Sequence, residues 1–237
     1  MPQKHGVPQF YVIPISHRTS MKFLLFLGTV RNSTPPNPPR LGLRVARACV
    51  TQMHQSGVSV ELIDPLDFDL EPIFKPHFAY AQGKAPAQLQ VLADKIAAAD
   101  GYVMVSPKYN HSLSPALAHL LNHFGSSLFS YKPSAIVTYS AGQWGGVRAA
   151  VGMRSFLSEL GCLPVSAMIH IPKAHEVLAE DGNFLDPADA ERWISYFARS
   201  FTQLTWWASA AQNQRNAIDP HKQVPAFKRD PSQRNAP

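Results

Sequence analysis

A mostly polar stretch at residues 106–115 separates two apolar runs, and its sequence is Ser106-Pro107-Lys108-Tyr109-Asn110-His111-Ser112-Leu113-Ser114-Pro115. The apolar run 102–105 before it is typical of a buried parallel strand. The amphipathic run 116–124 after it predicts a helix. Ser114 can accept a hydrogen bond from a free N–H at the helix start, and Pro115 suits the first helical position. The sequence therefore predicts a strand–loop–helix crossover.

The loop within this crossover carries more chemistry than a simple connection needs. Pro107 stiffens it, while Tyr109 and Asn110 place a flat ring and an amide near its tip. Such a loop suits a planar heterocycle better than a phosphate alone. The competing interpretation is an ordinary strand-to-helix loop with a capped helix, because most such loops hold no ligand.

Outward from this loop, apolar runs that predict strands alternate with amphipathic runs that predict helices. This alternation is typical of an α/β fold with right-handed crossovers. We expect a doubly wound, five-stranded parallel sheet in the order 2-1-3-4-5. The expected strands are 22–27, 58–63, 102–105, 133–139 and 163–169, and the expected helices are 41–55, 86–98, 116–124, 147–160 and 187–211.

One hydrophobic core accounts for these elements, so we expect one domain over residues 21–210. Residues 1–20 are expected to be a flexible extension, with a weak organelle-targeting signal as the alternative. Residues 211–237 are expected to be a basic, flexible tail. Of the formal net charge of +6, residues 1–20 carry +2 and residues 211–237 carry +3. The basic charge therefore lies mainly at the ends, and we expect no nucleic-acid partner.

Composition excludes several other protein classes. The 237 residues are 45% hydrophobic and 16% charged, which predicts a packed core and argues against global disorder. The two cysteines have no CxxC spacing, so a disulfide scaffold is not expected and a reducing compartment is. No apolar run approaches the roughly 20 residues of a membrane-spanning helix. We therefore expect a cytoplasmic protein without a membrane partner.

The segment after the first strand resembles an anion site. It carries Thr29, Arg31 and Ser33, and the helix that follows offers backbone N–H groups around Gly42. Helix N-termini and arginine side chains both favour negative charge, so a phosphate can bind here. The segment contains neither a Walker motif nor GxGxxG, and a capped surface loop is the alternative interpretation.

The loop after the fourth strand is rich in small residues, and it contains candidate ring contacts at Ser140, Ala141, Gly142, Gly145 and Gly146. Glycines let backbone N–H groups approach the edge of a ring closely. In the order 2-1-3-4-5, the loops after strands one, three and four share one edge of the sheet. A phosphate site beside a slot for a flat, polar-edged ring indicates a mononucleotide such as FMN.

Three motifs together resemble the NAD(P)H-dependent FMN reductases, a family that includes quinone and azo-dye reductases. The second and third motifs are specific as a pair, whereas the first alone is not. The resemblance adds Leu43, Lys108 and His111 to the candidate cofactor contacts. The motifs are Gly28-Thr29-Val30-Arg31 with residues 40–46, Pro107-Lys108-Tyr109-Asn110-His111-Ser112, and the run 140–149 beginning Ser140-Ala141-Gly142 and including Gly145-Gly146.

The resemblance implies a flavodoxin-like fold that binds FMN and uses NAD(P)H as co-substrate. Hydride would pass through flavin N5 to a quinone, azo or similar small acceptor, with no side chain required as a catalytic group. It also implies a homodimer or homotetramer, with residues 64–83 near the subunit contact. Two departures stand out: a proline-rich insertion at 32–39, and Lys108 where the family commonly has an acidic or polar residue.

Other functions remain open from the sequence. One is an FMN-binding electron carrier, and another is a flavin-dependent regulatory or interaction protein, neither using NAD(P)H directly. His119 and His123 have a metal-capable spacing, but Leu120 replaces the glutamate of an HExxH site. No G-x-S-x-G motif supports a serine hydrolase. The sequence does not distinguish NADH from NADPH, dimer from tetramer, or one acceptor from another.

Overall fold

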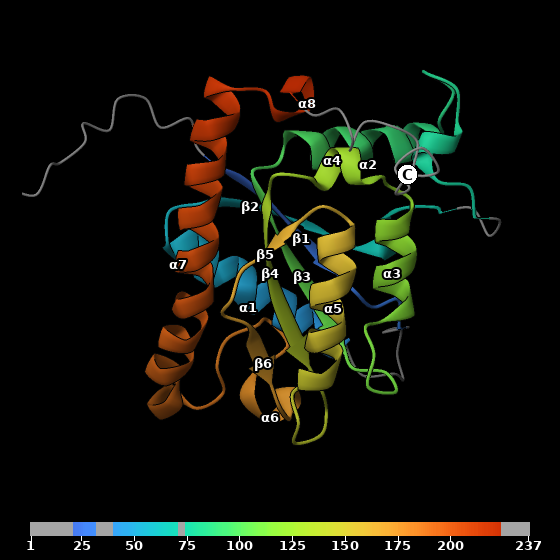
Figure 1. The fold of residues 1–237 in the computed structure, drawn as a ribbon. Coiled ribbons are helices and arrows are strands. Elements are labelled where there is room, and N and C mark those ends of the chain that lie inside the picture. The colour runs from blue at the N-terminus through green and yellow to red at the C-terminus, as the bar shows by residue number, and fades with distance from the viewer. Residues whose placement is uncertain (1–20, 32–39, 71–73, 224–237) are drawn as a thin grey trace, which may run out of the picture.

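A parallel sheet with helices on both faces forms the centre of the molecule (Figure 1). The computed structural model describes residues 21–31, 40–70 and 74–223. The strand order is β2-β1-β3-β4-β5, with β6 also paired to β4, so the predicted doubly wound α/β fold is confirmed. The strands are β1 (Lys22–Leu27), β2 (Ser59–Ile63), β3 (Gly101–Pro107), β4 (Pro133–Tyr139), β5 (Leu163–Pro164) and β6 (Ile169–Ile171).

The helices divide between the two faces of the sheet. The core cluster on one face contains residues of α1, α6 and α7, and the cluster on the other face contains residues of α2, α3, α4 and α5. None of the helices within the described ranges is long and apolar enough to cross a membrane. The helices are α1 (Leu41–Gln55), α2 (Ala87–Ala98), α3 (Pro115–Asn122), α4 (Ser126–Phe129), α5 (Val147–Glu159), α6 (Ala174–Val177), α7 (Pro187–Ala217) and α8 (Pro220–Gln223), with 3₁₀ turns η1 (Pro65–Asp67) and η2 (His77–Ala79).

Strand β1 is hydrophobic from Phe23 onward because these side chains are buried on both faces of the sheet. Phe23 and Leu25 face the α1/α7 side, whereas Leu24 and Phe26 face the α2/α3 side. Both faces are covered, so alternation between polar and apolar residues disappears. Each such side chain stabilises the fold by about 1.5–3 kcal/mol on burial, which holds the carboxyl ends of the strands in a fixed arrangement.

The predicted fifth strand, 163–169, is wrong as one continuous element. In the register, Ser134 of β4 pairs with Pro164 and Val137 pairs with Ile169. The two β4 residues are three positions apart in the sequence, whereas their partners on the neighbouring edge strand are five positions apart. The surplus residues leave the ladder, and Gln203 Oε1 accepts from the Ala167 N–H at 3.0 Å instead. Pro164 has no N–H, which favours an interruption of the edge strand here.

The predicted domain end at residue 210 also needs correction. Helix α7 continues to Ala217, and α8 follows it, so residues 211–223 are not a flexible tail. Gln212 and Arg215 donate to Asp100 Oδ1 at 3.0 and 3.1 Å, which ties this part of α7 to the start of β3. Residues 1–20 and 224–237 lie outside the described residues.

Candidate functional site

The loop from β3 to α3 is anchored at its base by two serines. Ser106 Oγ donates to Pro107 O at 2.8 Å and accepts from the Ser114 N–H at 2.9 Å. Ser114 Oγ in turn accepts from the Ala116 N–H at 3.1 Å, and Pro115 begins α3. The predicted cap is therefore confirmed, and the two ends of the loop are held together.

The tip of this loop is a tight two-residue turn. Tyr109 and Ser112 exchange backbone hydrogen bonds of 3.3 and 2.9 Å. Asn110 and His111 between them have φ values of 48° and 62°, as both central residues of a type I′ turn require. The turn leaves the Tyr109 side chain 43% exposed. Predicted site residues 109–111 thus form one rigid projection beside the sheet edge.

The loop from β4 to α5 is held from beneath by its backbone carbonyls. Ser140 O accepts from the Ala174 N–H at 3.0 Å, and Gly142 O accepts from the Lys173 N–H at 2.9 Å. The N–H groups of Ala141, Gly142, Gln143 and Trp144 have no hydrogen-bond acceptor among the residues that the structure describes. The loop therefore offers a row of four free donors on exposed residues, while two of its carbonyls are fixed to the segment after β6.

Gly145 and Gly146 lie behind this row rather than at its surface. Both are buried, with φ values of 56° and 82° that favour glycine. A Cβ on Gly146 would lie 2.8 Å from Thr138 Cβ, and one on Gly145 would lie 3.0 Å from Pro172 N. These two predicted residues therefore turn the chain tightly against β4 and β6.

The segment after β1 lies next to the last residues of β3. The Gly28 N–H donates to Val105 O at 2.7 Å, and the adjoining Thr29 is buried. Thr29 Oγ1 accepts from the N–H of Arg31, whose side chain is exposed. Ser33 lies within 32–39, outside the described residues.

The start of α1 packs directly against the end of β4. A Cβ on Gly42 would collide with the Tyr139 hydroxyl and would lie 2.7 Å from Thr29 Cγ2, so only glycine fits there. The Leu43 N–H is already used, donating to Arg40 O at 3.0 Å. Burial, with Tyr109 nearby, raises the pKa of the Tyr139 phenol, which therefore stays neutral.

Backbone and side-chain contacts bring the predicted loops together. The Lys108 N–H donates to Tyr139 O at 3.2 Å, which joins the β3 loop to the β4 loop. Arg148 Nη1 lies 3.1 Å from His111 Nε2, which joins the tip of the β3 loop to α5. The described residues predicted for the site thus share the carboxyl edge of β1, β3 and β4.

Positive charge gathers on one side of this edge. Desolvation, together with Arg148 and Lys108, lowers the pKa of His111, so this imidazole is neutral at pH 7. Arg148 and Lys108 remain as the cations beside it. An anionic group on a ligand would be favoured here.

Sequence reasoning missed two residues that shape the site, Tyr139 and Thr138. Tyr139 fills the space between Thr29 and Gly42, and Thr138 contacts the glycine turn. Both end an apolar strand directly before a glycine-rich loop. That position was the available signal, because side chains at the carboxyl end of a parallel strand lie nearest a ligand.

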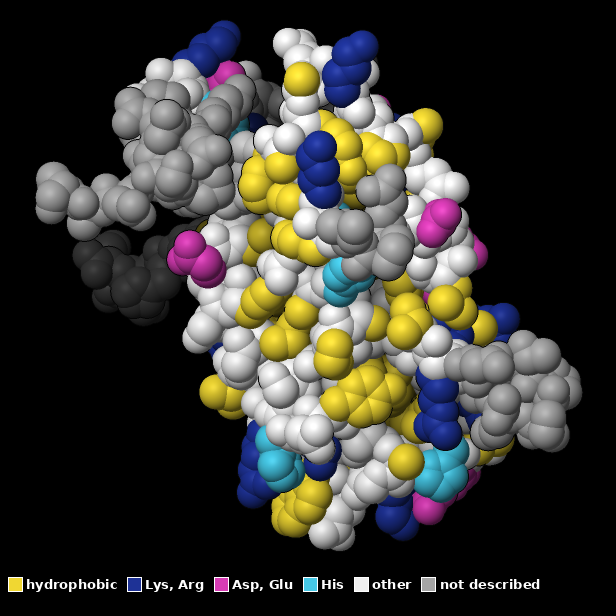
Figure 2. All heavy atoms as spheres, turned by 90° about the vertical axis from the view of Figure 1, so that its right-hand side faces the viewer, with side chains coloured by type: hydrophobic (Ala, Val, Ile, Leu, Met, Phe, Trp, Pro, Cys, Tyr) yellow, Lys and Arg dark blue, Asp and Glu magenta, His cyan; other side chains and the backbone are white. Residues whose placement is uncertain are grey.

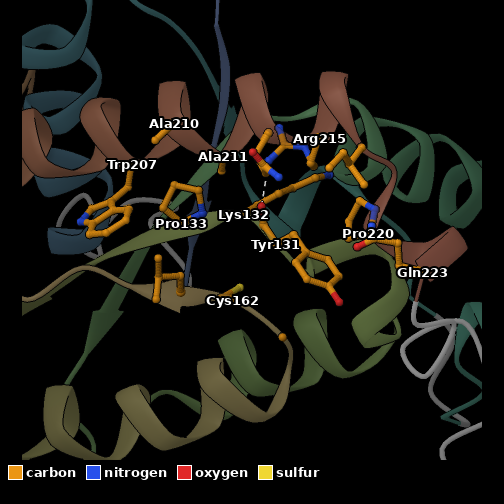
Figure 3. Close-up of a pocket in the computed structure, with 14 residues that line it drawn as sticks. Tyr131, Lys132, Pro133, Cys162, Trp207, Ala210, Ala211, Arg215, Pro220 and Gln223 are labelled. Atoms are coloured by element: carbon orange, nitrogen blue, oxygen red, sulfur yellow. Dashed lines mark hydrogen bonds between the residues drawn. The ribbon is translucent and has the colours of Figure 1, made fainter.

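A pocket lies elsewhere, at the amino ends of β4 and β5 (Figure 3). Its volume is about 550 Å³, and Tyr131, Pro133, Trp207 and Ile218 contribute to its mostly apolar lining. It contains none of the predicted site residues.

The His119 and His123 side chains lie with their Nε2 atoms 3.4 Å apart. No cluster of three metal-ligating side chains occurs in the described part of the chain.

Comparisons with known proteins point to one family of flavin reductases. The model of the NADPH-dependent FMN reductase family matches residues 21–176. An NAD(P)H-dependent FMN reductase, PA1204, from Pseudomonas aeruginosa is 31% identical over 134 residues, which cover 55% of this chain and 70% of that protein. A probable NADPH:quinone oxidoreductase from Oryza sativa subsp. japonica is 29% identical over 161 residues, covering 64% and 77%.

The fold is shared with solved flavoenzymes. The structure of FerB, a flavoenzyme NAD(P)H:(acceptor) oxidoreductase from Paracoccus denitrificans, superposes with a TM-score of 0.59 at 18% identity, covering 78% of this chain and 97% of that one. The family match spans well over half of the chain and includes β1, β3, β4 and the loops that follow them. The chain belongs to the NADPH-dependent FMN reductase family.

Proposed function

We propose that this flavin oxidoreductase binds FMN at the carboxyl edge of β1, β3 and β4 and uses NAD(P)H to reduce a quinone, azo compound or similar small acceptor. The observation that carries the proposal is the row of free N–H donors at 141–144, at the same edge of the sheet as the tight turn at 109–112. A ring with polar edges would satisfy these donors, and a purely apolar ligand would not.

The phosphate end of FMN would be held by Thr29, Arg31, Ser33 and the backbone around Gly42 and Leu43. The first turn of α1 contains no acidic residue, and no side chain caps it. The positive end of this helix is thus open to an anion. Since the Leu43 N–H is used within the chain, Thr29 and Arg31 are the stronger candidates among the described residues.

The ring end would be held by Pro107, Tyr109 and Asn110 on one side and by the N–H groups of 141–144 on the other. When bound, FMN supplies the hydride-transfer chemistry at N5. Backbone donors next to the ring would stabilise negative charge that reduction places on it. Ser140 Oγ donates to Gly142 O at 2.7 Å, which helps to keep these donors oriented. No side chain is assigned a catalytic role.

The cationic residues beside the ring site favour NADPH over NADH. Lys108 and Arg148 are both close enough to His111 to lower its pKa, and Arg148 contacts its ring. The extra 2′-phosphate of NADPH would add an anion to this cluster, and arginine binds phosphate through paired donors.

The test is anaerobic reduction of the FMN-loaded protein, followed at the flavin absorption band. We expect rapid bleaching by NADPH, slower bleaching by NADH at equal concentration, and reoxidation by menadione or methyl red. Protein that binds no FMN would refute the site. Protein that binds FMN but is not bleached would indicate an electron carrier or a regulatory protein.

We also propose that the chain forms a homodimer or homotetramer through the face that carries α3 and residues 64–83. Figure 2 shows hydrophobic side chains spread over the face of the molecule on which α3 lies. Phe74 and Phe78 are each 49% exposed, and the Phe74 ring lies 4.9 Å from the ring of His123, the residue that follows α3. Exposed aromatic side chains of this kind favour a protein interface.

Light scattering after size-exclusion chromatography tests this assembly. We expect a mass of two or four chains for the wild type and a shift toward the monomer for Phe78→Glu. Val91→Glu, at an exposed site on α2, is the matched control and should leave the mass unchanged. A wild-type monomer at micromolar concentration would refute the proposal.

A further inference from the structure

Thr138 connects the glycine turn of the β4 loop to β6. Its side chain is fully buried, and Oγ1 lies 2.8 Å from Gly145 O and 2.8 Å from His170 Nδ1. Thr138 and His170 are partners in the β4–β6 register, so the two side chains are neighbours across adjacent strands. One hydroxyl therefore joins the last turn of the loop to the edge of the sheet.

The proton positions in this group follow from hydrogen-bond chemistry. A carbonyl oxygen only accepts, so the single proton of the Thr138 hydroxyl points to Gly145 O. The hydroxyl must then accept from His170, whose proton is on Nδ1. The direction of both hydrogen bonds is thereby set, from His170 to Thr138 to Gly145.

His170 is itself held in place at the edge of the sheet. Its backbone N–H donates to the Tyr196 hydroxyl on α7 at 3.0 Å. On the other side of the group, Gly145 and Gly146 pack so closely against Pro172 and Thr138 that an added Cβ would lie within 3.0 Å of them. The loop is thus fastened at its far end by side chains, as it is fastened at Ser140 and Gly142 by backbone hydrogen bonds.

We propose that Thr138 and His170 are positioning residues for the flavin site. Through Gly145 they hold the backbone N–H groups of 141–144 in the orientation that binds the ring, although neither side chain needs to touch the cofactor. The inference rests on the proposed FMN site. Fixed donors bind more tightly than mobile ones, because less conformational entropy is lost when the ligand binds.

The test compares Thr138→Val, which keeps the branched shape but removes the hydroxyl, with Thr138→Ser, which keeps it. FMN affinity is measured by quenching of flavin fluorescence on titration of the FMN-free full chain. Thr138→Val leaves Gly145 O and the His170 Nδ1–H unpaired, so we expect about a tenfold loss of affinity. Thr138→Ser should stay within about twofold of wild type, as expected where the hydrogen bonds are kept.

Hydrogen exchange of the FMN-free protein gives a readout that does not involve flavin. Thr138→Val should speed exchange of the hydrogen-bonded amides that fasten the loop, those of Ser140, Lys173 and Ala174, while leaving β1 and β3 protected. Ser134→Ala is the control, because Ser134 is also fully buried on β4 but at the opposite end of the strand. It should change neither the loop exchange nor the affinity.

The proposal is overturned if Thr138→Val leaves both affinity and loop exchange unchanged, or if Thr138→Ser is as damaged as Thr138→Val. Should Thr138→Val fail to fold, His170→Ala decides, since His170 is only half-buried. Unchanged loop exchange in His170→Ala would then overturn the proposal. Wild-type protein that binds no FMN refutes the flavin site alone, because loop exchange still tests the fastening of the loop.

Discussion

Arg40 and Asp64 form a buried ion pair at the base of the candidate phosphate site, although they are 24 positions apart. Arg40 is 6% exposed and Asp64 is 8% exposed, and Arg40 also donates to Thr29 O at 2.8 Å. The pair joins the residue before α1 to the residue after β2. It thereby orients the segment that carries Thr29 and Arg31.

Asp64→Asn should destabilise the protein strongly, because it leaves the Arg40 charge buried without its carboxylate. We expect the free energy of unfolding to fall by about 3–5 kcal/mol, measured by urea denaturation. Glu61→Gln is the matched control, since Glu61 pairs with Lys95 at 2.6 Å on the surface. Its effect should stay below about 1 kcal/mol. Equal effects from both variants would contradict the structural role of the buried pair.

Arg148→Ala should raise the KM for NADPH much more than the KM for NADH. Loss of this cation should raise the KM for NADPH about tenfold, as expected for one charge-assisted phosphate contact, and should change the KM for NADH by less than about twofold. Steady-state kinetics with menadione as acceptor provides the measurement. Arg192→Ala, at a highly exposed site on α7, is the control. A parallel rise of both KM values would rule out phosphate recognition by Arg148.

The same arginine should control the titration of His111. Because Arg148 contributes to lowering the pKa of His111, Arg148→Ala should move that pKa upward toward 6.5. A pH titration of the His111 ring protons by NMR measures the change. Lys108→Ala should also raise the pKa of His111, by less than Arg148→Ala does, because Lys108 lowers this pKa less than Arg148 does. An unchanged pKa in both variants would mean that desolvation alone sets it.

Gly146→Ala and Gly152→Ala should have opposite effects on stability. Gly146 has a φ of 82°, and an added Cβ would lie 2.8 Å from Thr138 Cβ, so the substitution should destabilise by about 1–3 kcal/mol and weaken FMN binding. Gly152 lies within α5 with nothing within 4 Å of the added Cβ. Alanine there should stabilise by about 0.5–1 kcal/mol. Thermal unfolding of both variants checks the signs, and equal signs would contradict the described turn.

Lys132 should make stability depend on alkaline pH. Burial lowers its pKa from 10.5 to about 8, with the Arg215 charge contributing. Between these values the unfolded chain binds a proton that the folded chain does not. The contribution of Lys132 to the free energy of unfolding should therefore rise with pH, by about 3 kcal/mol in total.

The difference in unfolding free energy between wild type and Lys132→Met isolates this effect. It should increase in favour of wild type from pH 8 to pH 10.5, as measured by urea denaturation at each pH. Lys95→Met, which removes a lysine from a surface ion pair, is the matched control. A difference that does not vary with pH would show that Lys132 keeps its ordinary pKa in the fold.

Local sequence determined the helices, the strands and the helix cap at Ser114. The apolar run 133–139 became β4 at its predicted bounds, and residues 41–55 became α1. Ser114 capped α3 as its position before Pro115 predicted. These outcomes depend on periodicity and on hydrogen bonds between near neighbours, which a short stretch of sequence contains in full.

Tertiary structure decided which of these elements continue and which side chains meet. The end of α7 depends on hydrogen bonds from Gln212 and Arg215 to Asp100, over 110 positions away. The contact of Thr138 with His170 likewise exists only because β6 lies beside β4 after a break in the edge strand. Such pairings are set by the packing of distant segments around a common core, and no local pattern of residues contains that information.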